Sequence, residues 1–221
     1  MPSSPSERRR RIVGLSMIAS ATLSLATAVI LPANRSDLGD QVASVAAHPD
    51  RFVAATLVAL LSLILLVPAL LGLVHMLRDR APRLALVGGG LALAGVMPVA
   101  VQIALGLVEW QMVTAGAERT QMVALLNRIE FSAGFVPILF AAALPALGLC
   151  VLGAGLWRTR LTPRWIAVLL GAGAVALDLG FELPSLGVRI LAAALSLLAF
   201  AYLGRTVRGW SAEEWRAAPE R

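Results

Sequence analysis

The chain of 221 residues is 58% hydrophobic and only 14% charged. Soluble domains carry about 25% charged residues, so this composition excludes an ordinary soluble domain and indicates an integral membrane protein with several spans. The net charge of +6 does not indicate a nucleic-acid partner, because the arginines that produce it gather at the ends of apolar segments, where membrane topology favours them.

Six apolar segments follow one another along the chain. A helix rises about 1.5 Å per residue, so about 20 apolar residues cross a hydrocarbon core about 30 Å thick. We therefore predict an all-α, six-helix membrane bundle that forms one transmembrane domain over residues 12–204. The expected spans are residues 12–31, 53–77, 84–108, 132–157, 164–183 and 186–204.

The placement of arginine predicts the orientation of these spans. Fourteen arginines lie in residues 1–11, 78–83, 158–164 and 205–221, whereas five lie in the alternate links. Since cytoplasmic segments are enriched in arginine, we expect both termini in the cytoplasm, with a basic segment at 1–11 and a tail at 205–221 that holds a short interfacial helix. A cleavable signal peptide is the alternative for the first segment, but its apolar run exceeds the usual length of about 7–15 residues.

The two longer links outside the membrane each predict a short amphipathic helix. In the first link, Leu38, Val42 and Val45 recur at helical spacing before the sequence His48-Pro49. Both helices are expected to lie on the outer surface of the membrane. The apolar face of the second is predicted to consist of Met122, Leu125, Leu126 and Ile129.

Short motifs recur at an offset near 80 residues. The paired positions 52 and 131, 68 and 145, 82 and 163, and 90 and 171 are separated by 79, 77, 81 and 81 residues. They predict two units of the same orientation, each with an outer helix, a descending span, a basic turn and an ascending span. The alternative is that Arg and Pro at turns and Gly in packed spans recur for physical reasons alone.

No motif in the sequence indicates catalysis or a cofactor. The run Gly88-Gly89-Gly90 lacks the Lys-Ser/Thr ending and the preceding strand of a phosphate loop, and we interpret it as a surface that lets helices approach closely. His75 and His48 are expected on opposite sides of the membrane, so they cannot hold one haem. The single Cys150 excludes an intramolecular disulfide. We predict no catalytic residue, no metal and no cofactor, which argues against an enzyme.

The stretch LDLGFELPSLGVRI at 177–190 places three charges between the last two spans. A fifth span that ended before Asp178 would be too short to cross the membrane, so both helices are expected to continue to a turn at 183–185. Asp178 and Arg189 would then lie at the same depth, about 8 Å below the turn. We predict a salt bridge between them, because an unpaired charge at that depth is costly. Glu182 is expected nearer to water.

Other polar side chains are expected at the same end of the bundle. Gln102 and Glu109 would end the third span, and Arg128 and Glu130 would begin the fourth. Pairing at helix ends explains such residues most simply. The alternative is an extracytoplasmic cavity lined by a polar cluster of Gln102, Glu109, Arg128, Glu130, Asp178, Glu182 and Arg189.

Three stretches, AAHPDRF, LLGLVHMLR and GLWRTRLTPRWIAVLLGAG, resemble those of a family of bacterial multi-pass membrane proteins of about this length, whose function is uncharacterised. The resemblance covers residues 12–204 and implies a six-helix protein of the bacterial cytoplasmic (inner) membrane. It carries over no catalytic residue.

Three function classes follow from these features, and a membrane enzyme is the weakest of them because no nucleophile, metal set or haem set can be named. The sequence favours a structural or regulatory membrane protein, or a subunit of a membrane complex, whose partners are lipids and either another protein or a second copy of the chain. The alternative is a small transporter or a carrier of a lipid or small molecule. A cavity that reaches the middle of the bilayer would favour the carrier, whereas a closed bundle with an exposed face of small residues would favour the subunit.

Overall fold

The structure is a computed structural model that describes residues 5–32, 38–116, 118–182, 185–211 and 215, with the backbone alone described for Pro5, Ser6 and Glu182. These residues form nine helices and no strand. The helices are α1 (Pro5–Ile30), α2 (Leu38–Ala47), α3 (Pro49–Leu77), α4 (Pro82–Thr114), α5 (Arg119–Glu130), α6 (Val136–Ala141), α7 (Leu144–Thr159), α8 (Arg164–Glu182) and α9 (Leu186–Gly209).

Six stretches of helix in the described part of the chain are long and apolar enough to cross a membrane. Five of them are the single helices α1, α3, α4, α8 and α9, and the remaining one consists of α6 and α7. The predicted six-span helical architecture is therefore confirmed. Leu57, Leu61, Ile64 and Leu71 of α3 are exposed at helical spacing, as expected for a face that contacts lipid.

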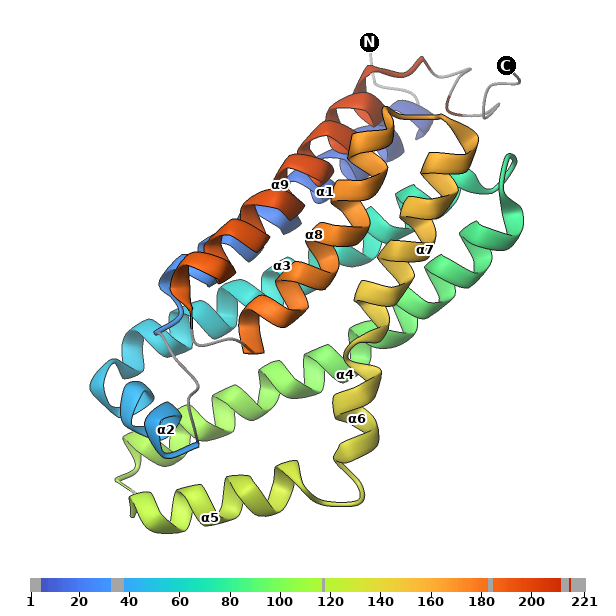
Figure 1. The fold of residues 1–221 in the computed structure, drawn as a ribbon. Helices are drawn as coiled ribbons and strands as arrows, with labels where there is room; N and C mark the ends of the chain where they lie inside the picture. Colours follow the sequence, from blue (N-terminus) through green and yellow to red (C-terminus); the bar gives the residue numbers. More distant parts are fainter. Residues whose placement is uncertain (1–4, 33–37, 117, 183–184, 212–214, 216–221) are drawn as a thin grey trace.

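The spans form a closed ring (Figure 1). Around the ring α1 packs on α3, then come α4, α7, α8 and α9, and α9 packs back on α1. Figure 1 shows that α1 begins and α9 ends at one end of the ring, where the turns at 78–81 and 160–163 also lie. We call this the terminal end. The opposite end, which carries α2 and α5, is the distal end.

The terminal half of the ring is tightly packed because small residues let the backbones come close. A Cβ added at Gly14 of α1 would lie 2.7 Å from the carbonyl oxygen of Gly204 of α9. Across the ring, a Cβ at Gly155 of α7 would lie 3.0 Å from Cδ1 of Leu77 of α3. Large side chains with less than 2% exposure fill the space between the helices: Met17, Leu70, Leu73, Met76, Leu77, Leu152, Leu156, Ile166, Leu170 and Leu203.

The glycine run of α4 acts as a packing surface in two of its three positions. A Cβ at Gly88 would lie 3.0 Å from the carbonyl oxygen of Gly148 of α7, and Gly89 lies against Val74 of α3. Gly90 faces outward, where a Cβ would meet nothing within 4 Å. The run therefore joins α4 to both of its neighbours.

The fourth span is broken between α6 and α7, at Ala142 and Ala143. Pro145 stands in the first turn of α7, where a missing N–H leaves no hydrogen bond unmade. Gly95 of α4 provides the space for this proline, since a Cβ at Gly95 would collide with the proline ring. The predicted continuous span at 132–157 is thus two helices, the second of which has a proline in its first turn.

The third span is longer than predicted, and its extra length carries the two short helices. The 33 residues of α4 extend about 50 Å, well beyond a core about 30 Å thick. At the distal end Val42 of α2 and Met122 and Leu126 of α5 form a buried cluster, against which Met112 and Val113 of α4 pack. The two amphipathic helices therefore bury Val42, Met122 and Leu126 against each other and α4. Leu125, which the sequence placed on the same apolar face, is exposed.

The C-terminal segment returns to the terminal end of α3. The ring of Trp215 lies 4.2 Å from the ring of His75 between centroids, and Nε2 of His75 donates to the carbonyl oxygen of Trp215 at 2.9 Å. Arg10 of α1 donates to the carbonyl oxygen of Trp210. His75, for which the sequence indicated no partner, thus contacts the C-terminal segment specifically. Residues 212–214 and 216–221 of the predicted interfacial helix lie outside the described residues.

Candidate functional site

The distal half of the ring encloses a cavity of about 350 Å³. All six spans contribute to its wall. It extends from Ser20 and Leu149, near the middle of the spans, to Leu31 and Phe52 at their distal ends. The wall is mostly apolar, with side chains of Leu, Ala, Val, Ile and Phe. The ring is therefore filled at its terminal end and hollow at its distal end.

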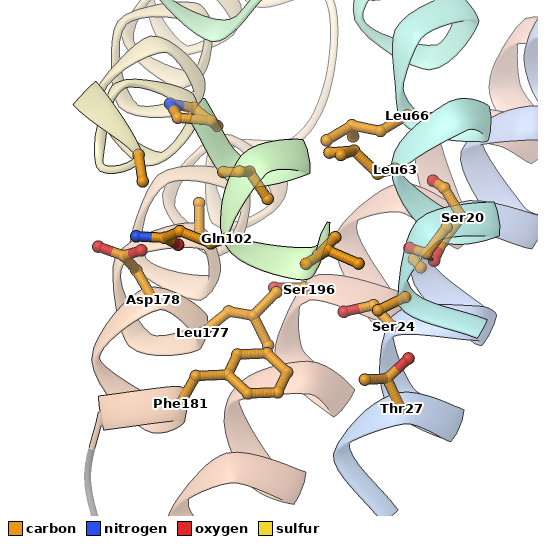
Figure 2. A pocket seen from close by; sticks show the side chains of 18 of the residues that line it. Ser20, Ser24, Thr27, Leu63, Leu66, Gln102, Leu177, Asp178, Phe181 and Ser196 are labelled. Atoms are coloured by element: carbon orange, nitrogen blue, oxygen red, sulfur yellow. Dashed lines mark hydrogen bonds between the residues drawn. The ribbon is translucent and has the colours of Figure 1, made fainter. Parts of the chain in front are cut away.

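Hydroxyl side chains form a stripe along one wall of the cavity (Figure 2). Ser20, Ser24 and Thr27 of α1 follow each other at intervals of four and three residues, which puts them on one face of the helix. Thr56 and Ser62 of α3 also line the cavity. These hydroxyls are not among the residues predicted from the sequence, although polar residues at helical spacing in an apolar span are a visible signal.

Ser196 of α9 adds a polar atom at the inner part of the wall. Its side chain is 6% exposed, and its hydroxyl oxygen makes no hydrogen bond with the described protein atoms. A buried hydroxyl without a partner costs about 1–3 kcal/mol.

Two members of the predicted polar cluster line the cavity. Gln102 lies within α4, not at its end, and Asp178 lies on α8, four residues before the helix ends. Figure 2 shows both side chains on the wall opposite Ser20, Ser24 and Thr27. Gln102 is partly buried, whereas Asp178 is exposed at the edge of the cavity.

The other acidic and basic members are elsewhere. Glu109 is 3% exposed and accepts a hydrogen bond of 2.7 Å from Nε2 of Gln41, so it anchors α2 to the distal part of α4. Arg128 and Glu130 belong to the last turn of α5 and do not begin the fourth span, since α6 starts at Val136. The side chain of Glu182 lies outside the described residues.

Arg189 has a role that the sequence did not indicate. Its side chain is buried, and it donates from Nε to the carbonyl oxygen of Ala28 at 3.0 Å and from a guanidinium nitrogen to that of Leu31 at 2.8 Å. The exposed Arg51 donates to the two carbonyls between these, those of Val29 and Ile30, at 2.9 and 2.5 Å. Two arginines from α3 and α9 therefore cap the last turn of α1.

This cap matches the electrostatics of a helix end. The last carbonyls of a helix have no partner within it and carry a partial negative charge. Arg51 and Arg189 supply both the donors and the positive charge. The predicted salt bridge between Asp178 and Arg189 stays a prediction, and Asp178 has a polar interaction of its own within the protein.

The described residues that line the cavity carry groups that can contact a small molecule. Among the described residues no three His, Cys, Asp or Glu side chains come close enough to hold a metal ion. The cavity offers apolar walls, six hydroxyls, one amide and one carboxylate. Such a set of a few polar groups in an apolar wall can orient a small molecule.

A ring of six helices, each long and apolar enough to cross a membrane, around an interior cavity defines a multi-pass membrane protein. The chain belongs to the family described as Domain of unknown function (DUF4386), whose model matches residues 12–207. The match covers most of the chain and confirms the resemblance to an uncharacterised family of membrane proteins. No curated protein and no solved structure matches the chain.

Proposed function

We propose that the protein is a membrane-embedded binding protein or carrier for a small, largely apolar molecule, which it holds in the interior cavity. The observation that carries this proposal is the contrast between the filled terminal half and the hollow distal half of one ring. Protein interiors normally contain few voids larger than a water molecule. A cavity of about 350 Å³ lies within the range of about 300–1,000 Å³ that is typical of ligand sites.

The depth of the cavity favours a carrier over the structural subunit that the sequence alone favoured. Its inner residues, such as Ser20 and Leu149, lie near the middle of their spans, and transporters bind their substrates near the bilayer midplane. The packed terminal half argues against an open channel, because Leu73, Leu77 and Leu152 are fully buried there.

We further propose that the membrane is a bacterial cytoplasmic membrane with both termini in the cytoplasm, so that the cavity faces the outer side. The arginine count of fourteen against five supports this orientation. Single cysteines at Asp79 and Glu118, in a chain with Cys150 changed to Ala, would be labelled in whole cells with a reagent that cannot cross membranes. Labelling at position 118 alone is expected, and labelling at position 79 alone would reverse the orientation.

The binding function is tested by filling the cavity. Gly106 of α4 lines the cavity, and the heavy atoms nearest to a Cβ there would be side-chain atoms of Phe52 and Thr56, no closer than 3.6 Å. A leucine at position 106 therefore projects into the hollow without a backbone clash. Gly90 of the same helix faces outward, so Gly90→Leu is the matched control.

Each protein would be extracted with its surrounding lipid by a styrene–maleic acid copolymer and examined by native mass spectrometry. The unaltered chain and Gly90→Leu are expected to retain a small molecule that Gly106→Leu has lost, with similar thermal unfolding of all three. Equal retention by Gly106→Leu, or no retained molecule in the unaltered chain, would contradict the proposal.

The subunit remains the second candidate because of α4. Only 11% of its apolar membrane-crossing stretch is buried within the protein, against 28–39% for the other five spans. Either lipid or a partner protein can cover this exposed face of α4. The same mass spectra distinguish the subunit from the carrier. A stoichiometric protein partner without a retained small molecule would favour the subunit.

A further inference from the structure

Four of the six hydroxyls that line the cavity already donate their proton to a backbone carbonyl. Three of these bonds lie within one helix, as is common for serine and threonine: Ser20 to Met17 at 3.3 Å, Thr27 to Leu23 at 3.0 Å and Thr56 to Phe52 at 2.9 Å. The fourth joins two helices, since Ser62 of α3 donates to the carbonyl oxygen of Ser20 of α1 at 2.8 Å. A hydroxyl has one proton, so these four have none left for a ligand.

Ser24 of α1 and Ser196 of α9 are the two exceptions. Neither hydroxyl makes a hydrogen bond with the described protein atoms. Ser196 is buried and does not bond back to its own helix. Its oxygen lies against Gly173 of α8, where a Cβ would be 3.1 Å away. Buried polar groups in proteins nearly always have a partner, so this proton points to an acceptor that is not part of the described chain.

The two unpaired hydroxyls belong to neighbouring helices and lie at a similar depth. α1 and α9 run antiparallel, with Gly14 against Gly204, while the carbonyl of Ala28 accepts from Arg189. This register places Ser196 only about 3–5 Å deeper than the unpaired serine of α1. Figure 2 shows both side chains on the wall of the cavity. The unused donors therefore lie together in one part of the wall.

The rest of the wall favours an acceptor without charge. None of the described residues that line the cavity is basic. A buried carboxylate without a positive partner is costly, so an anionic acceptor is disfavoured. A carbonyl oxygen is a neutral acceptor with two lone pairs, and unlike an alcohol it brings no donor of its own that needs a partner.

We infer that the cavity binds a neutral carbonyl compound, an ester or a ketone with an apolar body, whose carbonyl oxygen accepts a hydrogen bond from Ser196. Ser24 on the neighbouring helix is the second unused donor at this depth. The apolar body contacts the Leu, Ala and Phe side chains of the wall. This inference rests on the proposed binding function and names its ligand class.

Three probes with the same number of carbon atoms separate the possibilities: 5-phenylpentan-2-one, pentylbenzene and 5-phenylpentanoate. Their binding to the protein in lipid nanodiscs would be measured by titration calorimetry at neutral pH, with empty nanodiscs as the reference for partition into lipid. Gly106→Leu identifies binding in the cavity. The ketone is expected to bind about fivefold more tightly than the hydrocarbon, as one hydrogen bond between neutral groups allows. The carboxylate is expected to bind more weakly than the ketone.

Infrared spectroscopy reports the hydrogen bond itself. After subtraction of the Gly106→Leu spectrum, the carbonyl stretch of the bound ketone is expected at a lower frequency than in an alkane, because a hydrogen bond weakens the C=O bond. Ser196→Ala should restore the alkane frequency and bring the ketone within about twofold of the hydrocarbon.

Ser20→Ala is the matched control, since it removes a buried serine hydroxyl of the same wall whose proton is already used. It should change neither the frequency nor the preference for the ketone. Ser196→Ala is expected to fold, because it removes a buried polar group that has no partner. If it unfolds, the carbonyl frequency in the unaltered chain and the order of the three probes still decide the question.

The outcomes separate this inference from the function on which it rests. If the hydrocarbon or the carboxylate binds as tightly as the ketone and Gly106→Leu abolishes that binding, the cavity is a binding site but the ligand class is wrong. A ketone preference that survives Ser196→Ala, or a bound carbonyl with its alkane frequency, also overturns the ligand class. If no probe binds beyond its partition into lipid, or if Gly106→Leu changes none of the affinities, the proposed binding function fails as well.

Discussion

Arginine 189 allows a quantitative test of the helix cap at the distal end of α1. Replacement by methionine keeps the side-chain length and removes the donors to Ala28 and Leu31. A hydrogen bond to a charged group contributes about 1.5–3 kcal/mol. Some of this is offset because a buried charge no longer has to be desolvated. Arg189→Met is therefore expected to lower the free energy of unfolding by about 3 kcal/mol.

Arg51 provides the matched control, since it caps the neighbouring carbonyls of the same turn but is exposed. Water can replace an exposed donor, so Arg51→Met is expected to cost about 1 kcal/mol. Both variants would be unfolded at equilibrium in mixed micelles with an increasing fraction of sodium dodecyl sulfate, and helix content would be followed by circular dichroism. An Arg51→Met cost equal to or above that of Arg189→Met would refute the argument from burial.

The same variant tests the predicted salt bridge. In a double-mutant cycle with Asp178→Asn, a coupling energy of about 1 kcal/mol or more would support an Asp178–Arg189 pair. Additive effects within about 0.5 kcal/mol would mean that Arg189 stabilises the protein through α1 alone.

Two further comparisons test the packing of α4. Gly148→Ala should lower the free energy of unfolding by at least about 2 kcal/mol, because its Cβ would lie 2.5 Å from the carbonyl oxygen of Gly88. The control Gly90→Ala should be neutral or stabilising by up to about 1 kcal/mol, since alanine favours a helix. The same micelle unfolding measures both, and equal losses would contradict the close contact. Gln41→Ala should speed amide hydrogen exchange in α2, because it removes a donor to the buried Glu109. Gln121→Ala, which removes an exposed bond to Glu118, should leave exchange in α5 nearly unchanged.

The spans could be predicted from the sequence because hydropathy and arginine placement are local properties of the chain. The short helices α2 and α5 were also visible, since Val42 and Met122 belong to simple helical patterns. Their packing on α4 was not, because it depends on a third helix that extends beyond the membrane. The break before α7 was marked only by Pro145, and a proline alone does not distinguish a kink from an interruption.

The candidate site was predictable only in part, for a related reason. Gln102 and Asp178 stood out as polar residues in apolar segments, and both line the cavity. Arg189 also stood out, yet its acceptors are backbone carbonyls 158 and 161 residues away. Backbone acceptors have no residue signature, so no reading of side-chain types could identify them. The cavity itself depends on how the side chains of all six spans fill the space between them, so it is a property of the whole ring.

The closure of the ring between its first and last spans has a consequence for the synthesis of the protein. Arg51 follows Ile30 by 21 residues, whereas Arg189 follows Leu31 by 158. At about 5–20 residues per second, the first arginine emerges within about 1–4 s and the second only after about 8–32 s. Until then the nascent chain lacks half of the cap on α1 and the wall that contains Ser196 and Phe200. The wall of the cavity is therefore complete only after α9, the last span, has been inserted.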